Sequence, residues 1–461
     1  MFRGRVQRLH FIGIGGIGMS GIAEVLLNLG YDIHGSDLRV SKTTDRLSAL
    51  GAEIKIGHAA ENLNNADVVV TSTAVSTDNP EVRQAHRQGV PVIRRAEMLA
   101  ELMRLKYGIA VAGTHGKTTT TSLLATILGD GGIDPTVVIG GRLKSISTNA
   151  KLGDGEYLLA EADESDGSFL NLVPTLAIIT NIDPEHLDHW TGGMEQVRAA
   201  FIDFANKVPF YGCSVLCLDH PTVQSILPKL EKRYVTYGFT PQADYRASNL
   251  RLMDSRVEFS FSRFGEHWGN IILNMIGRHN VQNALAALAV ADEIGVPMEV
   301  AAASLESFQG VGRRFETKGE ANGVLVVDDY VHHPAEIQAT LLAARESYRR
   351  RMVVLFQPHR YSRTRDLMDD FATCFHEADV VLVTDIYAAS EQPIEGVSAK
   401  SLVDEIRKRG HHAVEYIAGG EEAWVLALLE HVRPGDMVLT LGAGNIVRAS
   451  EALMHELDEI F

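Results

Sequence analysis

The sequence predicts an α/β protein of about three domains. Its 461 residues are enough for three cores, because a domain commonly holds about 150 residues. Apolar strand-like runs alternate with helix-like segments in three successive stretches, which begin near residues 8, 106 and 316. Many of these runs end in glycine-rich or polar loops, as parallel strands do at their carboxyl ends. We therefore expect domains at residues 1–105, 106–314 and 315–461.

The composition is ordinary for a globular protein, with 45% hydrophobic and 22% charged residues. The net charge of −16 argues against a general surface for nucleic acids or anionic membranes, so anionic ligands must be held at local sites. Cys213 and Cys217 lie in an apolar stretch, which predicts buried free thiols in a reducing compartment. The N-terminus lacks a long apolar signal region, and no run of about 18 apolar residues follows. We expect a cytoplasmic protein.

A glycine motif opens the first stretch. Residues 9–14 read as a strand, Gly13-x-Gly15-x-x-Gly18 as a tight turn and residues 20–29 as a helix, and a second strand ends at Asp37. This pattern places a diphosphate on a helix N-terminus and a sugar diol beside a carboxylate. NAD and a UDP-sugar both offer these groups, so the motif alone leaves both ligands open.

A phosphate-binding loop organises the second stretch. An apolar strand at 109–112 precedes Gly113-Thr114-His115-Gly116-Lys117-Thr118, and an apolar helix follows. Backbone N–H groups of such a loop converge on phosphate oxygens, Lys117 can reach the β- and γ-phosphates, and Thr118 can place its hydroxyl on Mg²⁺. The usual spacing has glycine where this chain has Val111, but the strand and helix context favours the motif. We predict ATP hydrolysis or transfer.

Acidic loops follow two further strands, at 157–160 and 176–180. These loops contain Glu161, Asp163, Glu164 and Asp166, and then Asn181, Asp183, Glu185, His186 and Asp188. Carboxyl ends of parallel strands share one edge of a sheet, so we expect both loops beside the phosphate loop. Hard oxygen ligands suit Mg²⁺, and an imidazole can complete the shell of a second metal. The alternative is that most of these acids, including Asp163 and Asp183, are only solvated loop residues.

A polar helix start and an arginine pair close the second stretch. His279, Asn280 and Asn283 share one face of a helix at 277–291. Asn280 could cap this helix or contact an adenine edge. Glycines and the pair Arg313-Arg314 at 308–316 suggest a hinge with a phosphate contact.

The third stretch restarts the α/β pattern. Its strand-like runs end in loops that again define one edge of a sheet. Histidines, arginines and acids gather in these loops, namely Asp328, Asp329, Tyr330, His332, His333, His359, Arg360, Arg363 and Arg365. A single histidine is usually structural, but several histidines and arginines in loops at one edge indicate a functional site.

Seven segments together resemble, in order and spacing, those of the Mur ligases. They are residues 13–23, 113–120, 161–170, 277–287, 312–315, 328–334 and 356–364. The resemblance covers essentially the whole chain and is closest to the branch that adds L-alanine. Val331 stands where the family often has a smaller residue, which leaves the local backbone open because glycine adopts angles that valine does not. Residues 194–204 contain no lysine, so we predict none of the lysine carbamate found in several relatives.

The resemblance implies N- and C-terminal Rossmann-like domains that flank a central P-loop ATPase domain. It also implies the reaction: the lactyl carboxylate of UDP-N-acetylmuramate attacks the γ-phosphate of ATP, and the amine of L-alanine displaces phosphate from the acyl phosphate. ATP and Mg²⁺ would be the cofactors, with Mn²⁺ as an alternative metal. The protein would act in peptidoglycan precursor synthesis as a monomer or homodimer, without nucleic acid or membrane partners.

The resemblance also assigns roles to individual residues. The catalytic residues would be Lys117, Glu161, His186, His333 and Arg360, and the metal ligands would be Thr118, Glu161 and His186. ATP would be bound by Gly113, Thr114, His115, Gly116, Lys117, Thr118, Thr119, Asn280, Asn283, Arg314 and Asp329. The UDP-sugar would be bound by Gly15, Gly16, Ile17, Gly18, Ser36, Asp37 and Ser72. The amino acid or intermediate would meet Tyr330, His332 and Arg363.

Three other functions compete with this interpretation. An NAD-dependent oxidoreductase would use the first glycine motif but would leave Lys117 and Glu161 unexplained. A P-loop switch or regulatory ATPase would explain the phosphate loop but not three domains with polar edges. A sister ligase that recycles a peptide onto the same UDP-sugar would need a pocket for a tripeptide.

Overall fold

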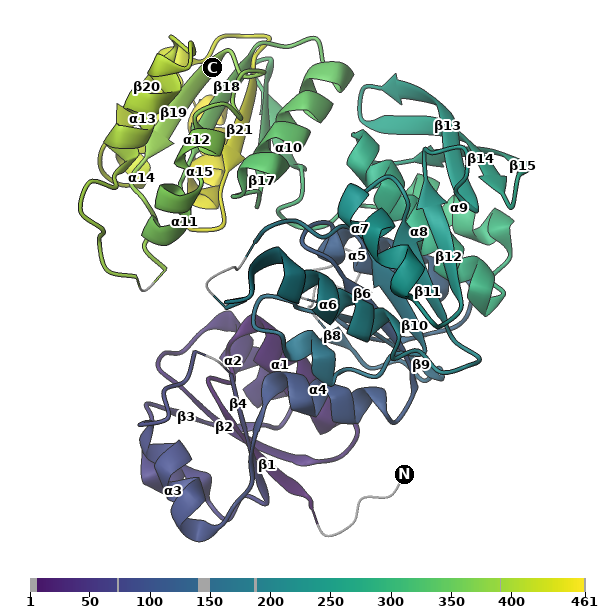
Figure 1. The fold of residues 1–461 in the computed structure, drawn as a ribbon. Helices are drawn as coiled ribbons and strands as arrows, with labels where there is room; N and C mark the ends of the chain where they lie inside the picture. The colour runs from purple at the N-terminus through teal and green to yellow at the C-terminus, as the bar shows by residue number, and fades with distance from the viewer. Residues whose placement is uncertain (1–5, 73, 140–149, 186–188, 390, 460–461) are drawn as a thin grey trace. The chain divides into compact units, whose positions relative to one another are not determined.

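The computed structural model describes residues 6–72, 74–139, 150–185, 189–389 and 391–459. The chain forms two compact units (Figure 1). The first unit comprises Met1–Leu250, Phe259–Ile272 and Val281–Gln309, and the second comprises Arg251–Glu258, Leu273–Asn280 and Gly310–Phe461. Strands and helices alternate along most of the chain, and the strands form sheets of five, ten and six strands. The predicted α/β class is therefore confirmed.

A five-stranded parallel sheet opens the first unit, in the order β3-β2-β1-β4-β5. Its strands are β1 (Arg8–Ile12), β2 (Asp32–Asp37), β3 (Glu53–Ile56), β4 (Val68–Thr71) and β5 (Val92–Arg94). Its helices are α1 (Ile17–Asn28), α2 (Lys42–Ala49), η1 (Ala60–Leu63), α3 (Pro80–Gln88) and α4 (Arg95–Met103). Because β1 lies between β2 and β4, the strand order reverses beside it. The glycine turn after β1 therefore lies at a topological switch point, where α/β sheets commonly bind ligands.

The ten-stranded sheet has the order β15-β14-β13-β12-β11-β10-β6-β9-β7-β8. Its strands are β6 (Tyr107–Ala112), β7 (Thr136–Val138), β8 (Ala150–Lys151), β9 (Tyr157–Glu161), β10 (Leu176–Ile179), β11 (Cys213–Cys217), β12 (Tyr234–Gly238), β13 (Tyr245–Met253), β14 (Arg256–Arg263) and β15 (Glu266–Leu273). The accompanying helices are α5 (Lys117–Asp130), η2 (Ser168–Asn171), α6 (Gly193–Ala205), α7 (Pro221–Ile226), η3 (Leu227–Lys229), α8 (Arg278–Ile294) and α9 (Met298–Ser307). β6 pairs in parallel with β9 on one side and β10 on the other. The phosphate loop and both acidic loops thus leave the same edge of the sheet, as predicted.

One continuous hydrophobic core joins the two sheets of the first unit. α1 packs against β7 and β8, and α4 packs against η2. Phe169, Phe201 and Phe204 lie at the centre of this core, and none of them is more than 1% exposed. Burial of each phenylalanine side chain contributes about 1.5–3 kcal/mol.

The second unit is built on a six-stranded sheet in the order β16-β17-β21-β18-β19-β20. Its strands are β16 (Glu316–Ala321), β17 (Val324–Asp329), β18 (Met352–Phe356), β19 (Val380–Thr384), β20 (Val414–Ile417) and β21 (Met437–Leu441). Its helices are α10 (Pro334–Ser347), α11 (Tyr361–Asp366), α12 (Met368–Phe371), α13 (Ala399–Lys408), α14 (Glu421–His431) and α15 (Val447–Glu459). All strand pairs except β16–β17 are parallel.

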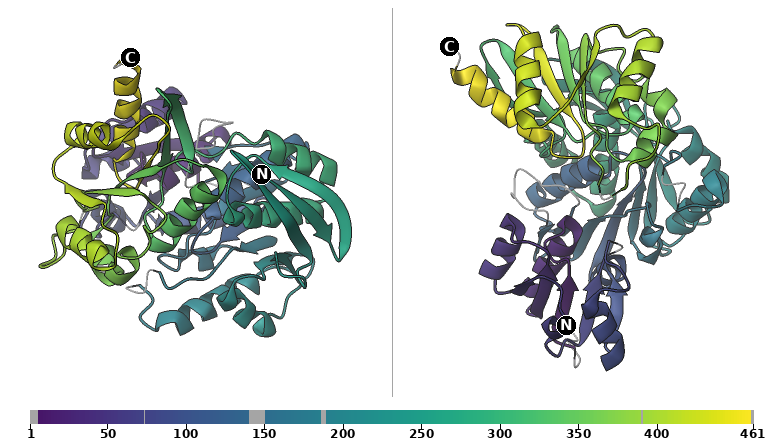
Figure 2. Two further views of the ribbon diagram at one scale, coloured as in Figure 1. Left: turned by 90° about the horizontal axis from the view of Figure 1, so that it is seen from above. Right: turned by 90° about the vertical axis from the view of Figure 1, so that its left-hand side faces the viewer.

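Helices cover both faces of this six-stranded sheet (Figure 2). Adjacent residues of one strand point to opposite faces, so Val326 joins one core cluster and Val327 the other. Leu341 of α10 packs with Val327, whereas Leu453 of α15 packs with Val326. A parallel sheet buried on both faces explains the nearly continuous apolar runs of its strands.

Cys213 and Cys217 are buried free thiols, as the sequence predicts, and so is Cys374. Burial raises the pKa of Cys213 to about 11 and that of Cys217 to about 12, so both stay protonated. Across the described parts of the chain, no helix combines the length and apolar character that crossing a membrane requires.

Phe201→Ala tests the shared core of the first unit. Phe201 is 1% exposed, so its truncation leaves a cavity and is expected to lower the free energy of unfolding by about 3–5 kcal/mol. Phe210→Ala is the matched control, because Phe210 is 90% exposed and its loss should change stability by less than about 0.5 kcal/mol. Thermal or urea unfolding measures both variants, and similar losses for the two would contradict the assignment of the core.

Candidate active site

The phosphate loop depends on two glycines with positive φ. Gly113 has φ +132° and Gly116 has φ +82°. An added Cβ would lie 2.0 Å from Thr180 Oγ1 at Gly113 and 2.5 Å from Asn283 Oδ1 at Gly116. Both positions therefore need glycine for backbone conformation and for space. Val111 is fully buried within β6, so the residue that departs from the usual motif belongs to the strand core and not to the loop.

The ammonium of Lys117 is buried and fully engaged with protein oxygens. Its Nζ donates to the carbonyl of Gly113 (2.5 Å), the carbonyl of Thr114 (3.1 Å) and Oε2 of Glu164 (2.8 Å). Burial alone would lower the pKa of Lys117, but the carboxylates of Glu164, Asp163 and Glu161 outweigh burial and raise it. Lys117 therefore carries a positive charge, as a phosphate ligand must.

The carboxyl end of β10 holds the phosphate loop in place. Asn181 Oδ1 accepts from the His115 amide (2.7 Å), and Asn181 Nδ2 donates to the His115 carbonyl (3.0 Å). Thr180 Oγ1 donates to the same carbonyl (2.6 Å). These bonds fix the backbone of the loop before any ligand binds, so little ordering is needed on binding.

Asp183 is tied to the phosphate loop and is not merely solvated. Its amide donates to Thr114 Oγ1 (2.9 Å). Its two carboxylate oxygens lie 3.5 Å from His115 Nε2 and 3.1 Å from His220 Nε2. His220 was not predicted from the sequence, because it follows β11 with no motif around it.

Oxygen donors beside the phosphate loop are of the kind that binds Mg²⁺. Glu161 ends β9 and pairs in register with Val111, and Thr118 is the second residue of α5. A carboxylate and a hydroxyl are hard ligands, so these residues fit Mg²⁺. His186, the third predicted ligand, lies outside the described residues. Within the described part of the chain, no three His, Cys, Asp or Glu side chains cluster closely enough to hold a metal.

The two asparagines of α8 are both buried. Asn283 accepts from Thr120 Oγ1 (3.2 Å) and lies against Gly116, so it packs against the phosphate loop and the start of α5. Asn280 Nδ2 donates to the carbonyl of Ile276 (2.8 Å), which stabilises the turn before the helix. Their predicted contact with adenine stays a prediction.

The glycine turn after β1 is held by the end of β2. Asp37 Oδ2 accepts from the Gly15 amide (2.8 Å), and a Cβ at Gly15 would lie 2.8 Å from the same oxygen. The Ser36 carbonyl accepts from the Gly13 amide (2.8 Å). Gly16 is exposed at the start of α1, which continues through Ile17 and Gly18. Ser72 follows β4, the other neighbour of β1, so the predicted UDP-sugar residues share one edge of the sheet.

A fully buried carboxylate, Glu81, supports this edge and was missed by the sequence analysis. Its Oε2 accepts from Ser36 Oγ (2.6 Å) and lies 3.1 Å from His10 Nε2, while its Oε1 accepts from Asn62 Nδ2 (2.6 Å). Burial raises the pKa of Glu81, but these hydrogen bonds outweigh burial and lower it. His58 Nδ1 lies 2.9 Å from Ser36 Oγ. Glu81 therefore fixes the serine that precedes Asp37.

In the second unit, the side chain of Arg313, which lies just before β16, is hydrogen-bonded to the six-stranded sheet and to the loop after β21. Its guanidinium donates to Asp328 Oδ2 (3.1 Å) and to the carbonyls of Gly442 (2.7 Å) and Gly444 (3.2 Å). Asp328 also accepts from Thr440 Oγ1 (2.7 Å). Of the predicted arginine pair, Arg313 is thus used by the protein itself, and Arg314 lies 5.3 Å from the centre of the Tyr330 ring.

Asp329 is a buried carboxyl group whose pKa is raised to near neutral pH. It ends β17, is 4% exposed and accepts from Thr340 Oγ1 (3.1 Å). Burial raises the pKa of Asp329 to about 7, even though Arg314 acts in the opposite direction. Near neutral pH this group can therefore accept or release a proton.

A row of rings runs along the edge of the six-stranded sheet. Ring centres of Tyr330 and His332 lie 5.5 Å apart, as do those of His332 and His359. The His359 ring stacks on Tyr387, also at 5.5 Å. These aromatic contacts place two predicted residues, Tyr330 and His332, side by side.

Positive charge gathers at the end of this row. Arg363 Nη1 lies 3.4 Å from His359 Nδ1, and Arg360 has an unusual φ of +72°. Burial, together with His332, Arg363 and Arg360, lowers the pKa of His359 to about 3, so this ring is neutral. Two arginines beside a neutral imidazole suit a carboxylate or phosphate ligand.

His333 and Val331 have local structural roles. His333 is the N-cap of α10, and its Nδ1 accepts from the Ala335 amide (3.3 Å). Val331 is 5% exposed, packs in the core and does not have a positive φ. The loop therefore accommodates valine without the angles that only glycine adopts.

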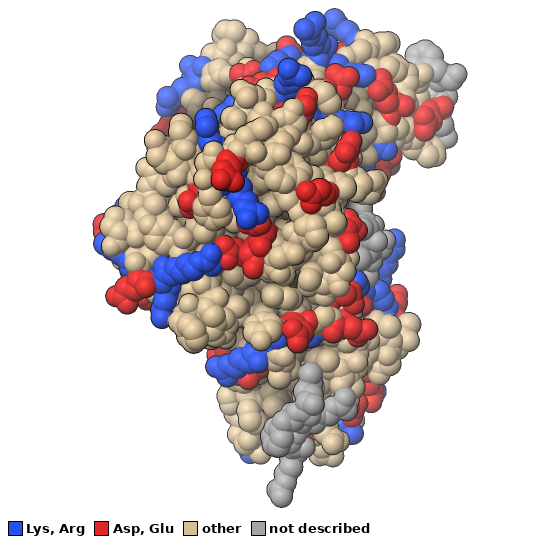
Figure 3. Space-filling model, turned by 90° about the vertical axis from the view of Figure 1, so that its right-hand side faces the viewer, with Lys and Arg blue, Asp and Glu red and all other residues tan. Residues whose placement is uncertain are grey.

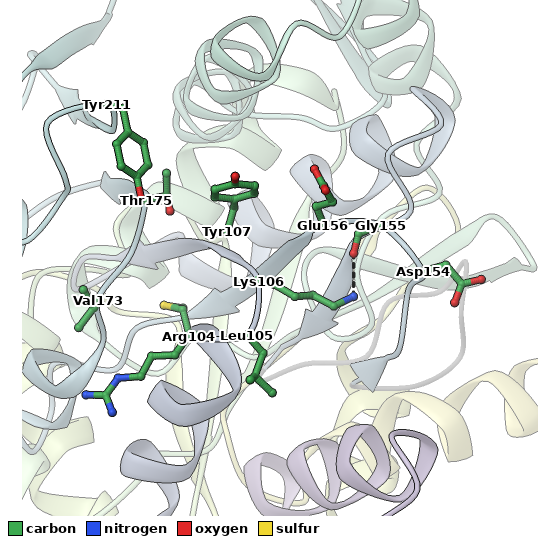
Figure 4. A pocket seen from close by; sticks show the side chains of 11 residues that line it. Arg104, Leu105, Lys106, Tyr107, Asp154, Gly155, Glu156, Val173, Thr175 and Tyr211 are labelled. Atoms are coloured by element: carbon green, nitrogen blue, oxygen red, sulfur yellow. Dashed lines mark hydrogen bonds between the residues drawn. The ribbon is translucent and has the colours of Figure 1, made fainter. Parts of the chain in front are cut away.

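A pocket of about 790 Å³ lies at the opposite end of β6 (Figure 4). Lys106, Glu156 and Thr175 line it, and each precedes a strand of the ten-stranded sheet. Lys106 Nζ donates to the carbonyls of Gly153 (2.6 Å) and Gly155 (2.7 Å). This pocket is therefore separate from the phosphate loop, which follows the other end of the strand.

Surface charges of both signs are interspersed on the face in Figure 3. Among the described residues on this face, no extended area of one sign is visible.

Gly116→Ala tests the phosphate loop. The substitution forces a left-handed residue, which costs about 1–2 kcal/mol, and places a methyl group against Asn283. We expect ATP affinity, measured by calorimetry, to fall at least about tenfold. Gly129→Ala is the control, because an added Cβ there has no neighbour within 4 Å and Gly129 lies in the last turn of α5, at the other end of the helix from the loop. Normal ATP affinity in Gly116→Ala would contradict this geometry.

Comparison with known proteins places these features in a family. Three family models match successive parts of the chain: "Mur ligase family, catalytic domain" at residues 8–107, "Mur ligase middle domain" at 111–291 and "Mur ligase, glutamate ligase domain" at 313–444. The UDP-N-acetylmuramate–L-alanine ligase of Geobacter sulfurreducens is 60% identical over 457 residues, with 99% of each chain covered. The enzyme of the same name from Anaeromyxobacter dehalogenans is 59% identical over 458 residues, again with 99% of each chain covered.

Solved structures agree with this comparison. The UDP-N-acetylmuramate-alanine ligase MurC of Thermotoga maritima matches with a TM-score of 0.83 and 29% identity, over 98% of this chain and 100% of that chain. The murein peptide ligase mpl of Psychrobacter arcticus matches with a TM-score of 0.71 and 25% identity, over 99% of both chains. The chain therefore belongs to the Mur ligase family.

Proposed function

We propose that this chain is an ATP-dependent ligase that joins L-alanine to the lactyl carboxylate of UDP-N-acetylmuramate in peptidoglycan precursor synthesis. The observation that carries the proposal is 60% identity, over 99% of both chains, with a relative that bears this activity in its name. The predicted chemistry agrees, because the edge of the ten-stranded sheet carries a phosphate loop beside carboxylates. We place the reaction in the cytoplasm, where ATP is available.

The alternatives read from the sequence fit less well. An oxidoreductase would leave the phosphate loop unused, and a regulatory ATPase would leave two further sheets with polar edges unused. The peptide-recycling ligase is closer, but the match to the Psychrobacter murein peptide ligase has the lower TM-score, 0.71 against 0.83 for the Thermotoga alanine ligase.

Lys117 would act on the transferring phosphoryl group. Its ammonium is held by Glu164 (2.8 Å), and the γ-phosphate of ATP would replace this partner. As the lactyl carboxylate attacks the γ-phosphorus, Lys117 would offset the charge on the phosphoryl oxygens. Thr118 and Glu161 would hold one Mg²⁺ or Mn²⁺, and His186 would hold a second; such an ion would supply positive charge that offsets the phosphate oxygens.

The glycine turn after β1 would bind the UDP-sugar. First-turn amides of α1 at Ile17 and Gly18 would face the diphosphate, and Asp37 would accept from a ribose hydroxyl. Because Asp37 is already held by the Gly15 amide, its carboxylate is positioned before the ligand binds.

The ring row and arginines of the second unit would receive the amino acid or intermediate. Arg360 and Arg363 would pair with a carboxylate or acyl phosphate, and His332 would lie beside them. The attacking amine must be neutral, so a group that accepts a proton near pH 7 is needed. Asp329, with its pKa raised to about 7 by burial, meets this requirement, and His333 is the second candidate.

Lys117→Ala tests the assignment of the phosphate loop. Loss of the ammonium is expected to lower kcat for amide formation at least about a hundredfold, with UDP-sugar affinity nearly unchanged. Lys151→Ala is the control, because Lys151 is exposed and pairs with Asp134. Substantial ligase activity in Lys117→Ala, measured by ADP and amide formation, would show that the assignment is wrong.

The acceptor is tested by phosphate release. The protein is incubated with ATP, Mg²⁺ and UDP-N-acetylmuramate, and with L-alanine, glycine, L-serine, D-glutamate or the tripeptide in parallel. Turnover chiefly with L-alanine is expected, although one methyl group discriminates against glycine by only about 1–3 kcal/mol. Preference for the tripeptide would indicate the recycling ligase, and release without any acceptor would indicate a regulatory ATPase.

A further inference from the structure

Gly18 is needed because of an arginine side chain. A Cβ at Gly18 would lie 2.8 Å from Arg95 Nη1 and 3.3 Å from Arg95 Cζ. In the usual dinucleotide fingerprint the third glycine allows a helix to pack closely on a strand. Here it allows the guanidinium of Arg95, the first residue of α4, to lie directly over the first turn of α1.

This position concentrates positive charge at the glycine turn. The first turn of α1 contains no acidic residue, and its amides carry partial positive charge. Arg95 adds a full charge, and its side chain is 28% exposed, so a ligand at the turn can reach it. A doubly charged diphosphate matches this combination, whereas a neutral sugar would not.

The other side of the same guanidinium faces the acidic loop after β9. Arg95 Nη2 lies 3.9 Å from Asp163 Oδ2. Asp163 precedes Glu164, which holds Lys117, and its Oδ1 accepts from the Ser165 amide (3.1 Å). Arg95 thus lies between the glycine turn and the loop that holds the phosphate-binding lysine.

We propose that Arg95 is a positioning residue that couples the UDP-sugar site to the ATP site. The diphosphate of the bound UDP-sugar pairs with the guanidinium and draws it away from Asp163. The negative charge of Asp163, no longer offset by Arg95, then adds to those of Glu161 and Glu164, which favours the divalent cation that accompanies ATP. This inference rests on the proposed function, because it requires a UDP-sugar at the glycine turn.

Calorimetry on the full chain tests the coupling. The Kd of a non-hydrolysable ATP analogue with Mg²⁺ is measured with and without saturating UDP-N-acetylmuramate, in the absence of L-alanine. In the wild type the UDP-sugar is expected to tighten analogue binding at least about fivefold, and the analogue should tighten UDP-sugar binding by the same factor. The coupling ratio is the Kd of the analogue without UDP-sugar divided by its Kd with UDP-sugar. In Arg95→Ala this ratio should fall to about one, and UDP-sugar affinity alone should fall about tenfold.

Three further variants separate coupling from simple binding. Asp163→Asn removes the other partner, so it should also bring the ratio to about one, but UDP-sugar affinity should be kept or improved. Arg94→Ala is the matched control, since Arg94 is the exposed neighbour of Arg95 and should leave the ratio unchanged. Arg95→Lys keeps the charge without the planar group, so its ratio should lie between one and that of the wild type. This variant keeps the test valid if Arg95→Ala does not fold.

Two results would overturn the inference: a ratio of one in the wild type, or a ratio in Arg95→Ala equal to that of the wild type. Failure of the proposed function looks different, because the wild type would then not bind UDP-N-acetylmuramate at all.

Discussion

The pairing of one buried ammonium governs the candidate site of the first unit. Lys117 is enclosed by the phosphate loop, and removal of one partner from a buried ion pair costs about 3–5 kcal/mol because a charge is left uncompensated. Glu164 meets this need at 2.8 Å. The pairing is possible only because β6 lies beside β9, so that the loops after both strands leave the same edge of the sheet. Strand order therefore places Glu164 where, in the proposed function, the γ-phosphate of ATP would replace it.

Local motifs explain why much of this arrangement could be predicted from the sequence. A strand, a glycine loop and a helix are consecutive in the chain, so residues 109–130 could be recognised directly. The acidic loops could be placed beside them because parallel strands present their carboxyl ends on one edge. The alternative that these acids are only solvated loop residues is wrong for Asp183, whose carboxylate lies 3.5 Å from His115 Nε2, whereas the side chain of Asp163 is 45% exposed and lies 3.9 Å from Arg95.

What the sequence could not provide are contacts between distant residues. Glu81 meets Ser36 across 45 positions, and Arg313 meets the Gly442 carbonyl across 129. No motif surrounds Glu81, and the arginine pair that includes Arg313 gives no sign of a partner 129 positions away. Arg313 illustrates the consequence: its sequence suggested a phosphate contact, but the sheet of its own unit uses its guanidinium. Burial, which decides the pKa of Asp329, also depends on packing that periodicity alone does not define.

The two candidate edges hold charge in opposite ways, and this difference determines which ligand each can accept. At the first edge, carboxylates surround a single ammonium, so a polyphosphate can bind only together with cations that offset those carboxylates. At the second edge, Arg360 and Arg363 stand beside a histidine that is neutral because its pKa is lowered to about 3 by burial and its cationic neighbours. A single carboxylate can bind there without a metal ion. The charge at each edge thus agrees with the proposed function, in which the nucleotide and its metal would bind at the first edge and the amino acid or intermediate at the second.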